Sequence, residues 1–172
     1  YYNLTNDSGN AVDISGIVNE QLKDLVLINH SLLLIGSTNT FVTQFNSWPY
    51  TINDTLKVVL SYTITEDPDT GEPIYTYEYL TDAIKSITNL SIEENEYLVI
   101  ATSSNIYFTE NPFNQNSYSN IVENSIVRVI SNFDYNSQRG IADLSNINKV
   151  YNVGKRFLAV IVSNKLLLIG EN

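Results

Sequence analysis

Few side chains in this 172-residue chain could carry out acid, base or metal chemistry. His30 is the only histidine, so any mechanism that needs an imidazole would have to use it. It falls at the tip of a predicted hairpin, with no Gly-x-Ser-x-Gly turn anywhere in the chain to supply a nucleophile. We therefore interpret His30 as a turn residue.

A first acidic cluster precedes one of the apolar runs. Glu93, Glu94 and Glu96 could be taken for the acid and base of a hydrolase. Successive residues on a turn point to different sides, however, so their carboxylates would not converge on one substrate. A solvated turn is the better interpretation.

A second acidic cluster, formed by Asp67, Asp69 and Glu72, lies between two runs rich in Thr and Tyr. Its spacing supplies too few oxygen ligands for a complete calcium site. Pro68 and Pro73 fix their backbone φ angles, and Gly71 allows a positive φ. These turn-forming residues predict a hairpin at 61–80 that extends out of the repeat as an excursion. We expect no catalytic residue, no cofactor and no metal, and we predict that the protein is not an enzyme.

Composition excludes several classes of protein. Nineteen acidic and nine basic residues give a net charge of -10, which repels phosphate backbones and argues against a nucleic-acid reader. No apolar run reaches the length of a membrane span, so no membrane insertion is expected. Cysteine is absent, which excludes disulfides, and methionine is absent too, which suggests processing before Tyr1 or a piece of a longer protein.

The elements that would position these residues are β-strands, because Tyr, Phe, Ile, Val and Thr are abundant. The pentapeptide LLLIG occurs at Leu32 to Gly36 and again at Leu166 to Gly170. Segments starting at Asp24, Glu96 and Arg156 each consist of an apolar run, a short polar break and a second apolar run. That pattern is typical of a tight β-hairpin.

The similarity extends beyond the hairpins, since Phe45 to Ser61 matches Gln115 to Ser131 in constant register. We infer an internal repeat with a period of about 60 to 74 residues. One unit would contain four short antiparallel strands, which is the blade of a β-propeller. The expected strands lie near 83–89, 97–102, 106–109 and 125–131.

The predicted fold is therefore all-β and consists of antiparallel four-stranded blades. The chain would hold about 2.5 blades, roughly 11–80, 81–140 and 141–172, whereas a propeller closes with about four to eight. We expect a partial propeller, an incomplete piece of a larger ring. The runs Leu32 to Ile35 and Leu166 to Ile169 are continuously apolar, which predicts that both faces of each strand are buried.

Basic residues are concentrated in the last third of the chain. Arg139, Lys149, Lys155 and Arg156 occur there, with Asp143 among them. A mixed surface is the simpler interpretation, and an interaction surface is the alternative.

The loop after the third strand is the most distinctive part of each repeat: "NTFVTQFNSWPY" in one and "ENPFNQNSYSN" in the other. Trp48, Tyr50, Phe113 and Tyr118 are the aromatic residues that could serve as contact residues. They would either stack on sugars and anchor a partner, or close the end of the blade against its own core.

The segment "NEYLVIATSSNIYFTENPFNQNSYSNIVENS", centred on Ile106, resembles the β-propeller repeats of nozzle- or muzzle-type tail proteins of short-tailed phages. The copy from Leu32 departs from that pattern because it lacks the Tyr-Phe pair. The resemblance implies an oligomeric structural protein of the virion tail, which guides DNA ejection and host attachment. Its partners would be other copies of itself and other tail proteins, and DNA would only pass along an acidic surface without sticking.

Two other functions stay open. One is a carbohydrate- or receptor-binding propeller of a phage or bacterial surface protein, located outside the cell or on its surface, with Trp48 and Tyr118 in contact with a host glycan or receptor. The other is a glycan hydrolase that uses paired carboxylates on a propeller.

Overall fold

The computed structural model of the chain describes residues 2–3, 8–9, 20–29, 31–44, 54–111, 113, 121–122, 126–131 and 144–170. Over these residues the protein is built of β-strands and contains no helix, so the all-β prediction is confirmed. The strands are β1 (Tyr2–Asn3), β2 (Ser8–Gly9), β3 (Asp24–Ile28), β4 (Ser31–Ile35), β5 (Thr40–Gln44), β6 (Asp54–Thr55), β7 (Lys57–Glu66), β8 (Pro73–Tyr79), β9 (Ser86–Ile92), β10 (Asn95–Ala101), β11 (Asn105–Glu110), β12 (Ile121–Val122), β13 (Ile126–Ser131), β14 (Ile147–Asn152), β15 (Phe157–Val162) and β16 (Lys165–Gly170).

Eleven of the strands form three antiparallel sheets, in which each strand pairs with the next one of the same sheet along the chain. Their orders are β3-β4-β5-β6, β9-β10-β11-β13 and β14-β15-β16. The remaining strands form the small sheets β1-β2 and β12-β7-β8. Each of the four strands expected near 83–131 lies within about three residues of β9, β10, β11 or β13.

Tight turns join the strands at the polar breaks in the sequence. Asn29, Glu93 and Ser163 have φ values of 52°, 55° and 51°, and each lies in the short turn between two hairpin strands. A left-handed residue gives a short turn the twist that paired strands need. Between β10 and β11, Thr102 N donates to Asn105 O at 2.9 Å.

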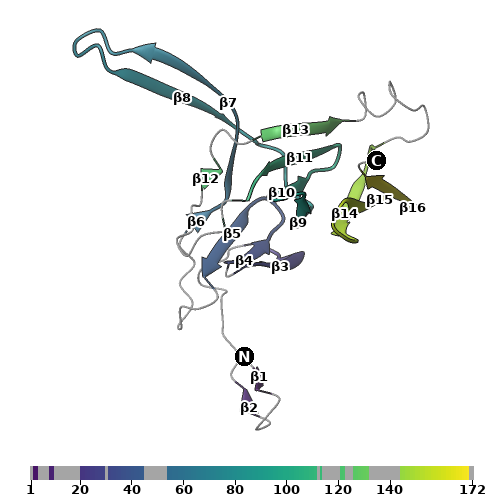
Figure 1. The fold of residues 1–172 in the computed structure, drawn as a ribbon. Coiled ribbons are helices and arrows are strands. Elements are labelled where there is room, and N and C mark those ends of the chain that lie inside the picture. The colour runs from purple at the N-terminus through teal and green to yellow at the C-terminus, as the bar shows by residue number, and fades with distance from the viewer. Residues whose placement is uncertain are drawn as a thin grey trace.

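The central sheet β9-β10-β11-β13 packs against another sheet on each of its two faces (Figure 1). Successive residues of β10 point to opposite faces, so Leu98 and Ile100 belong to one core cluster and Val99 and Ala101 to the other. The first cluster contains Ile28, Leu33, Ile35, Val42, Leu56, Val58, Ile87, Leu98, Ile100, Tyr107 and Phe113. The second contains Leu90, Val99, Ala101, Ile106, Phe108, Ile130, Leu144, Ile147, Val150, Leu158, Val160 and Val162.

The first strands of the three sheets, β3, β9 and β14, lie close together. Ser86 on β9 accepts a hydrogen bond from Val150 N on β14 at 3.2 Å, and its hydroxyl lies 3.4 Å from Val150 O. Lys149 on β14 also forms an ion pair with Asp24 on β3, with 3.1 Å between Nζ and Oδ2. The three sheets thus meet at their first strands, but over the described residues they do not close a ring.

A long hairpin formed by β7 and β8 extends away from the three sheets (Figure 1). We call this hairpin, 57–79, the arm. At its tip Asp67 N donates to Glu72 O, and Gly71 N donates to Asp67 O, both at 2.8 Å. The hairpin expected at 61–80 is therefore present.

The two segments that the sequence alignment made equivalent occupy different places. Ile126–Ser131 is β13 and pairs with β11, whereas 56–61 runs into β7, which pairs with β8 and with β12. In the alignment β4 corresponds to β11. One edge of β11 pairs with β13, whereas the equivalent edge of β4 pairs with the additional strand β5. One further strand thus moves the aligned segment out of the first sheet and into the arm.

Burial confirms one of the two expectations for the apolar runs and contradicts the other. On β4, Leu33 and Ile35 are fully buried, Leu34 is 5% exposed and Leu32 is half-buried. On β16, Leu166 and Leu168 are 65% and 68% exposed. The expectation was wrong for β16 because no described element covers the second face of the sheet β14-β15-β16.

Candidate functional site

Of the four aromatic residues expected to make contacts, Phe113 alone falls within the described part of the chain. Trp48, Tyr50 and Tyr118 lie outside the described residues. Phe113 is 1% exposed and belongs to the first core cluster. Its backbone is also held, since Phe113 N donates to Asn111 Oδ1 at 2.9 Å and Asn29 Nδ2 donates to Phe113 O at 3.0 Å. Phe113 is thus buried in the protein's own core, which agrees with the second of the two roles expected for these aromatic residues, and it is not an exposed contact residue.

The glutamates that could resemble an acid and base lie at the turn between β9 and β10. Glu93 has a left-handed φ of 55°, and Glu93 and Glu94 are exposed there. Glu96 instead holds the loop that follows β11, because its backbone oxygen accepts from Asn111 N at 3.0 Å. Its carboxylate also accepts from Asn111 Nδ2 at 3.5 Å. His30 lies outside the described residues.

The acidic turn of the arm uses its first carboxylate for local structure. Asp67 Oδ1 accepts hydrogen bonds from Asp69 N at 2.8 Å and Thr70 N at 3.2 Å. This arrangement satisfies the turn's backbone donors in the way aspartate commonly does. Among the described residues no group of three or more His, Cys, Asp or Glu could hold a metal ion.

The arm carries a row of aromatic rings on one face, all of them exposed except the half-buried Tyr77. Tyr62 lies opposite Tyr77 and Ile64 lies opposite Tyr75, so these side chains share a face with Tyr79. Neighbouring tyrosine rings in this row have centroids 6.0 to 6.4 Å apart. Tyr75 and Ile64 are 49% and 55% exposed, and a contiguous row of exposed apolar side chains favours an interaction surface.

The row could have been found from the sequence by its period of two. In 73–79, tyrosines occur at every second position, at Tyr75, Tyr77 and Tyr79. Alternation of this kind predicts that they share one face of a strand. Sequence reasoning identified the arm as a Thr/Tyr-rich excursion without assigning a role to this face.

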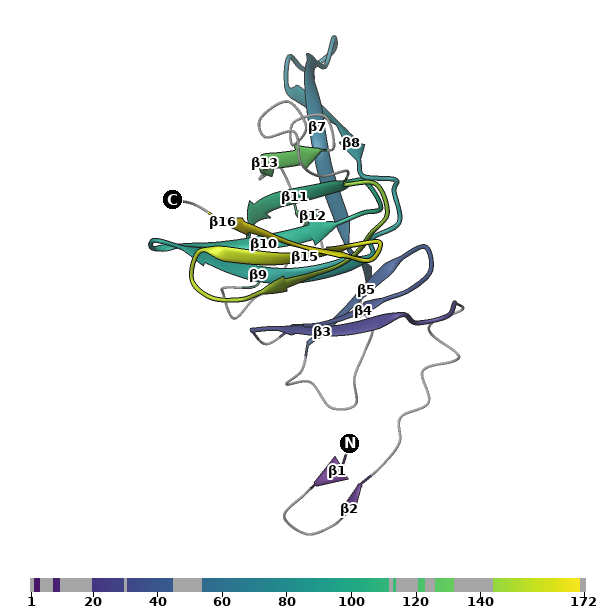
Figure 2. The same ribbon diagram turned by 90° about the vertical axis from the view of Figure 1, so that its right-hand side faces the viewer.

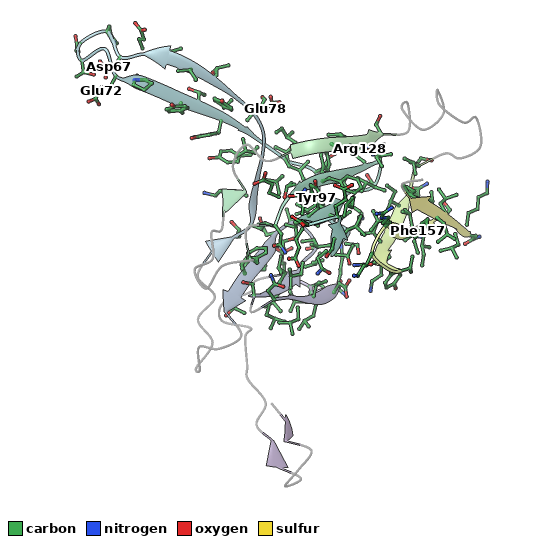
Figure 3. The ribbon with its side chains drawn as sticks, in the orientation of Figure 1. Asp67, Glu72, Glu78, Tyr97, Arg128 and Phe157 are labelled. Atoms are coloured by element: carbon green, nitrogen blue, oxygen red, sulfur yellow. The ribbon has the colours of Figure 1, made fainter. Side chains whose placement is uncertain are left out.

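The rest of the arm is polar and acidic. Asp67 and Glu72 lie at its outer end, and Glu78 lies nearer the sheets (Figure 3). Ser61 Oγ donates to Glu78 Oε2 at 2.7 Å on the face opposite the tyrosines. Between 61 and 80 there are five acidic residues and no Lys, Arg or His: Glu66, Asp67, Asp69, Glu72 and Glu78.

A second exposed apolar surface lies on the sheet β14-β15-β16, on the side away from the second core cluster. We call it the outer face. Pairing places Tyr151 beside Ala159 and Leu168, and Ile161 beside Leu166, with Phe157 on the same side. Phe157 and Tyr151 are 47% and 43% exposed.

The border of the outer face is basic. Lys149, Lys155, Arg156 and Lys165 occur in 144–170, which contains no Asp or Glu. The hydrogen bond to Asp24 is the main cause that raises the pKa of Lys149 above its ordinary value. Arg139 and Asp143, which the sequence grouped with these residues, lie outside the described part of the chain.

A carboxylate that sequence reasoning missed holds the turn between β4 and β5. Glu20 Oε2 accepts from Ser37 Oγ at 2.7 Å and from Thr38 N at 2.5 Å, and Oε1 accepts from Asn39 Nδ2 at 2.8 Å. Desolvation raises the pKa of Glu20, but these hydrogen bonds together outweigh it and lower the pKa from 4.5 to about 2. Glu20 thus has a structural role in directing β5 back along β4.

Comparisons with known proteins found no protein-family model that matches the chain and no similar curated protein. In the described part of the chain there is no helix long and apolar enough to cross a membrane. The surfaces with the clearest functional character are therefore the arm and the outer face.

Proposed function

We propose that this chain is a non-enzymatic structural component of a larger assembly, the nozzle- or muzzle-type end of a short-tailed phage tail. In this proposal its sheets act as blades of a β-propeller, and the assembly guides DNA ejection and host attachment. The net charge of -10 suits a surface along which DNA slides without binding.

The observation that carries the proposal is the way in which the three sheets stack. Each sheet is an antiparallel meander, the central one is covered on both faces, and their first strands β3, β9 and β14 lie together. Blades of a propeller are arranged in this manner around their axis. The contacts from β14 to β9 and to β3, through Val150 and Lys149, support such an axis.

Exposed apolar side chains at both ends of the stack also favour a place in an assembly. Leu25 and Leu27 are 58% and 52% exposed on β3, and Leu166 and Leu168 are exposed on β16. Neighbouring exposed apolar side chains on one face of a strand favour an interaction site.

Electron cryomicroscopy of purified particles of the phage that would encode this chain tests the proposal. We expect a ring of identical copies at the end of the tail, with the sheets arranged as blades. Particles that lack the chain, or a chain that is present only as a free monomer, would contradict the proposal.

The exposed tyrosine row favours a second candidate, a carbohydrate- or receptor-binding module, because aromatic rings at a surface stack on sugars. A glycan array distinguishes the two candidates. Binding that is lost in Tyr75→Ala or Trp48→Ala, and kept in Thr76→Ala on the arm's other face, would favour this second function. No glycan binding by the unmodified chain would leave the structural role as the better explanation.

A further inference from the structure

We propose that the arm of one copy of this chain lies on the outer face of a second copy, so that copies join head to tail. The inference rests on the proposed structural role and names the partner and the two surfaces involved. The arm contributes acidic residues and a tyrosine row, and the outer face contributes basic and apolar residues.

Charge complementarity is the first argument. The part of the arm from 61 to 79 has five acidic residues and no basic one, whereas 144–170 has four basic residues and no acidic one. Lys149 is already paired with Asp24. Lys155, Arg156 and Lys165 are exposed, and none of the three forms an ion pair with another described residue. They are available to a partner with acidic side chains.

Apolar complementarity is the second argument. The tyrosine row with Ile64 covers one face of the arm, and Phe157, Leu166 and Leu168 are prominent on the outer face. A hairpin of two strands is only marginally stable alone in water, so the arm gains stability when its apolar face is covered. Tyrosine is also enriched at the centres of protein interfaces.

The positions of the two surfaces exclude contact between them within one copy. The arm and the sheet that carries Phe157 lie on opposite sides of the molecule (Figure 3). Figure 2 looks onto β15 and β16, with the arm reaching away above them. The contact therefore joins different copies and repeats from one copy to the next. A head-to-tail contact of this type produces a ring when the rotation closes and a filament when it does not.

Charge exchange between the two surfaces tests the proposal. One variant reverses three acids of the arm, Glu66→Lys, Asp69→Lys and Glu72→Lys, and keeps Asp67 because its carboxylate builds the turn. A second variant reverses the border of the outer face, Lys155→Glu, Arg156→Glu and Lys165→Glu. A third variant carries all six changes. Sedimentation velocity over a range of concentrations measures the association of each, and circular dichroism checks that each is folded.

We expect the unmodified chain to associate in a concentration-dependent manner, and more weakly at high salt. Each three-residue variant should associate about tenfold more weakly or worse, because like charges then face each other. The six-residue variant should regain association, and so should a mixture of the two three-residue variants. The matched control, Lys23→Glu, Lys57→Glu and Arg128→Glu, reverses three exposed basic residues that lie outside both the acidic part of the arm, 61–79, and the basic segment 144–170. It should associate like the unmodified chain.

A chain that is monomeric at every concentration would overturn the proposal. Association that persists in both three-residue variants would also overturn it, by showing that another surface such as that of Leu25 and Leu27 carries the contact. A folded six-residue variant that stays dissociated would do the same. Rings in phage particles together with any of these results would remove this interface and leave the proposed function standing. If the six-residue variant regains association but the chain is absent from phage particles, the interface would stand and the proposed function would be overturned.

Discussion

The two copies of LLLIG lie in opposite environments. In β4, Leu33 and Ile35 have no exposed surface, and Leu34 has 5%. In β16, Leu166 and Leu168 are 65% and 68% exposed. An apolar run thus indicates a strand that can be buried on both faces, but whether it is buried depends on which sheets lie beside it.

The glycine that ends each copy also has different neighbours. A Cβ at Gly36 would lie 2.6 Å from the carboxylate of Glu20 and 2.9 Å from Asn39 O, so glycine is needed for the turn that leads into β5. A Cβ at Gly170 would collide with the ring of Phe157, a side chain that is 47% exposed and can rotate away. The fold therefore requires glycine more strictly at position 36 than at position 170.

Leucine truncation should give the largest difference between the two copies. Leu33→Ala leaves a cavity in the first core cluster and should lower the free energy of unfolding by about 2 to 5 kcal/mol. Leu168→Ala removes an exposed side chain and should change it by no more than about 0.5 kcal/mol. Urea denaturation at a concentration where the chain is monomeric measures both. Equal losses would show that the outer face is covered even in the monomer.

Glycine substitution should give a smaller difference. Gly36→Ala should lower the free energy of unfolding by about 1 to 3 kcal/mol, because the backbone oxygen of Asn39 cannot easily move. Gly170→Ala should lower it by less than about 1 kcal/mol, because rotation of Phe157 relieves the overlap. Thermal unfolding of the two variants tests this order, and a larger loss for Gly170→Ala would reverse our interpretation.

The hydrogen bonds of Glu20 should make the turn after the first copy sensitive to acid. The folded-state pKa is about 2 and the ordinary value is 4.5, so between these values the unfolded chain binds more protons at this site. The stabilisation from Glu20 is therefore present above pH 4.5 and decreases as the pH falls toward 2.

Glu20→Gln should remove this part of the pH dependence and lower the free energy of unfolding by about 1 kcal/mol at neutral pH. Glu94→Gln, on the exposed turn between β9 and β10, is the matched control and should retain it. Urea denaturation at several pH values between 2 and 6.5 compares the three proteins. An unchanged pH dependence in Glu20→Gln would show that the carboxylate does not hold the turn.

The ion pair near the first strands should have the smallest effect. Lys149 and Asp24 are partly exposed, at 37% and 20% of their side-chain surface, and their charges lie 3.1 Å apart. A double-mutant cycle with Lys149→Ala and Asp24→Ala should give a coupling below about 1 kcal/mol. A much larger coupling would mean that this pair, rather than apolar packing, holds the first and third sheets together.

Several elements could be predicted from the sequence because their signals are local. Polar breaks between apolar runs predict the hairpin turns, and the arm follows from Asp67 to Pro73 between Thr/Tyr-rich runs. The strand β5 and the role of Glu20 could not be predicted in this way. Glu20 contacts residues 17 to 19 positions further along the chain, and such a contact leaves no periodic pattern in the sequence.

The candidate surfaces were only partly predictable for the same reason. Lys149, Lys155 and Arg156 were recognised from the sequence as part of either a mixed or an interaction surface, and the structure shows Lys155 and Arg156 exposed beside Phe157 on the sheet that carries the outer face. Phe113 has the aromatic character of a contact residue, but it is buried in the structure. Asn29 and Asn111 hold its backbone there by hydrogen bonds, and the contact with Asn29 spans 84 positions of the sequence.

By itself the sequence determined that this protein is all-β and where most of its hairpins turn. It also determined that an acidic hairpin, the arm, lies between the first and second apolar hairpins. These properties depend on side-chain type and spacing over a few residues. Only the tertiary structure decided that one LLLIG strand is buried and the other exposed. Burial depends on the neighbouring sheets, and the same five residues are compatible with either environment.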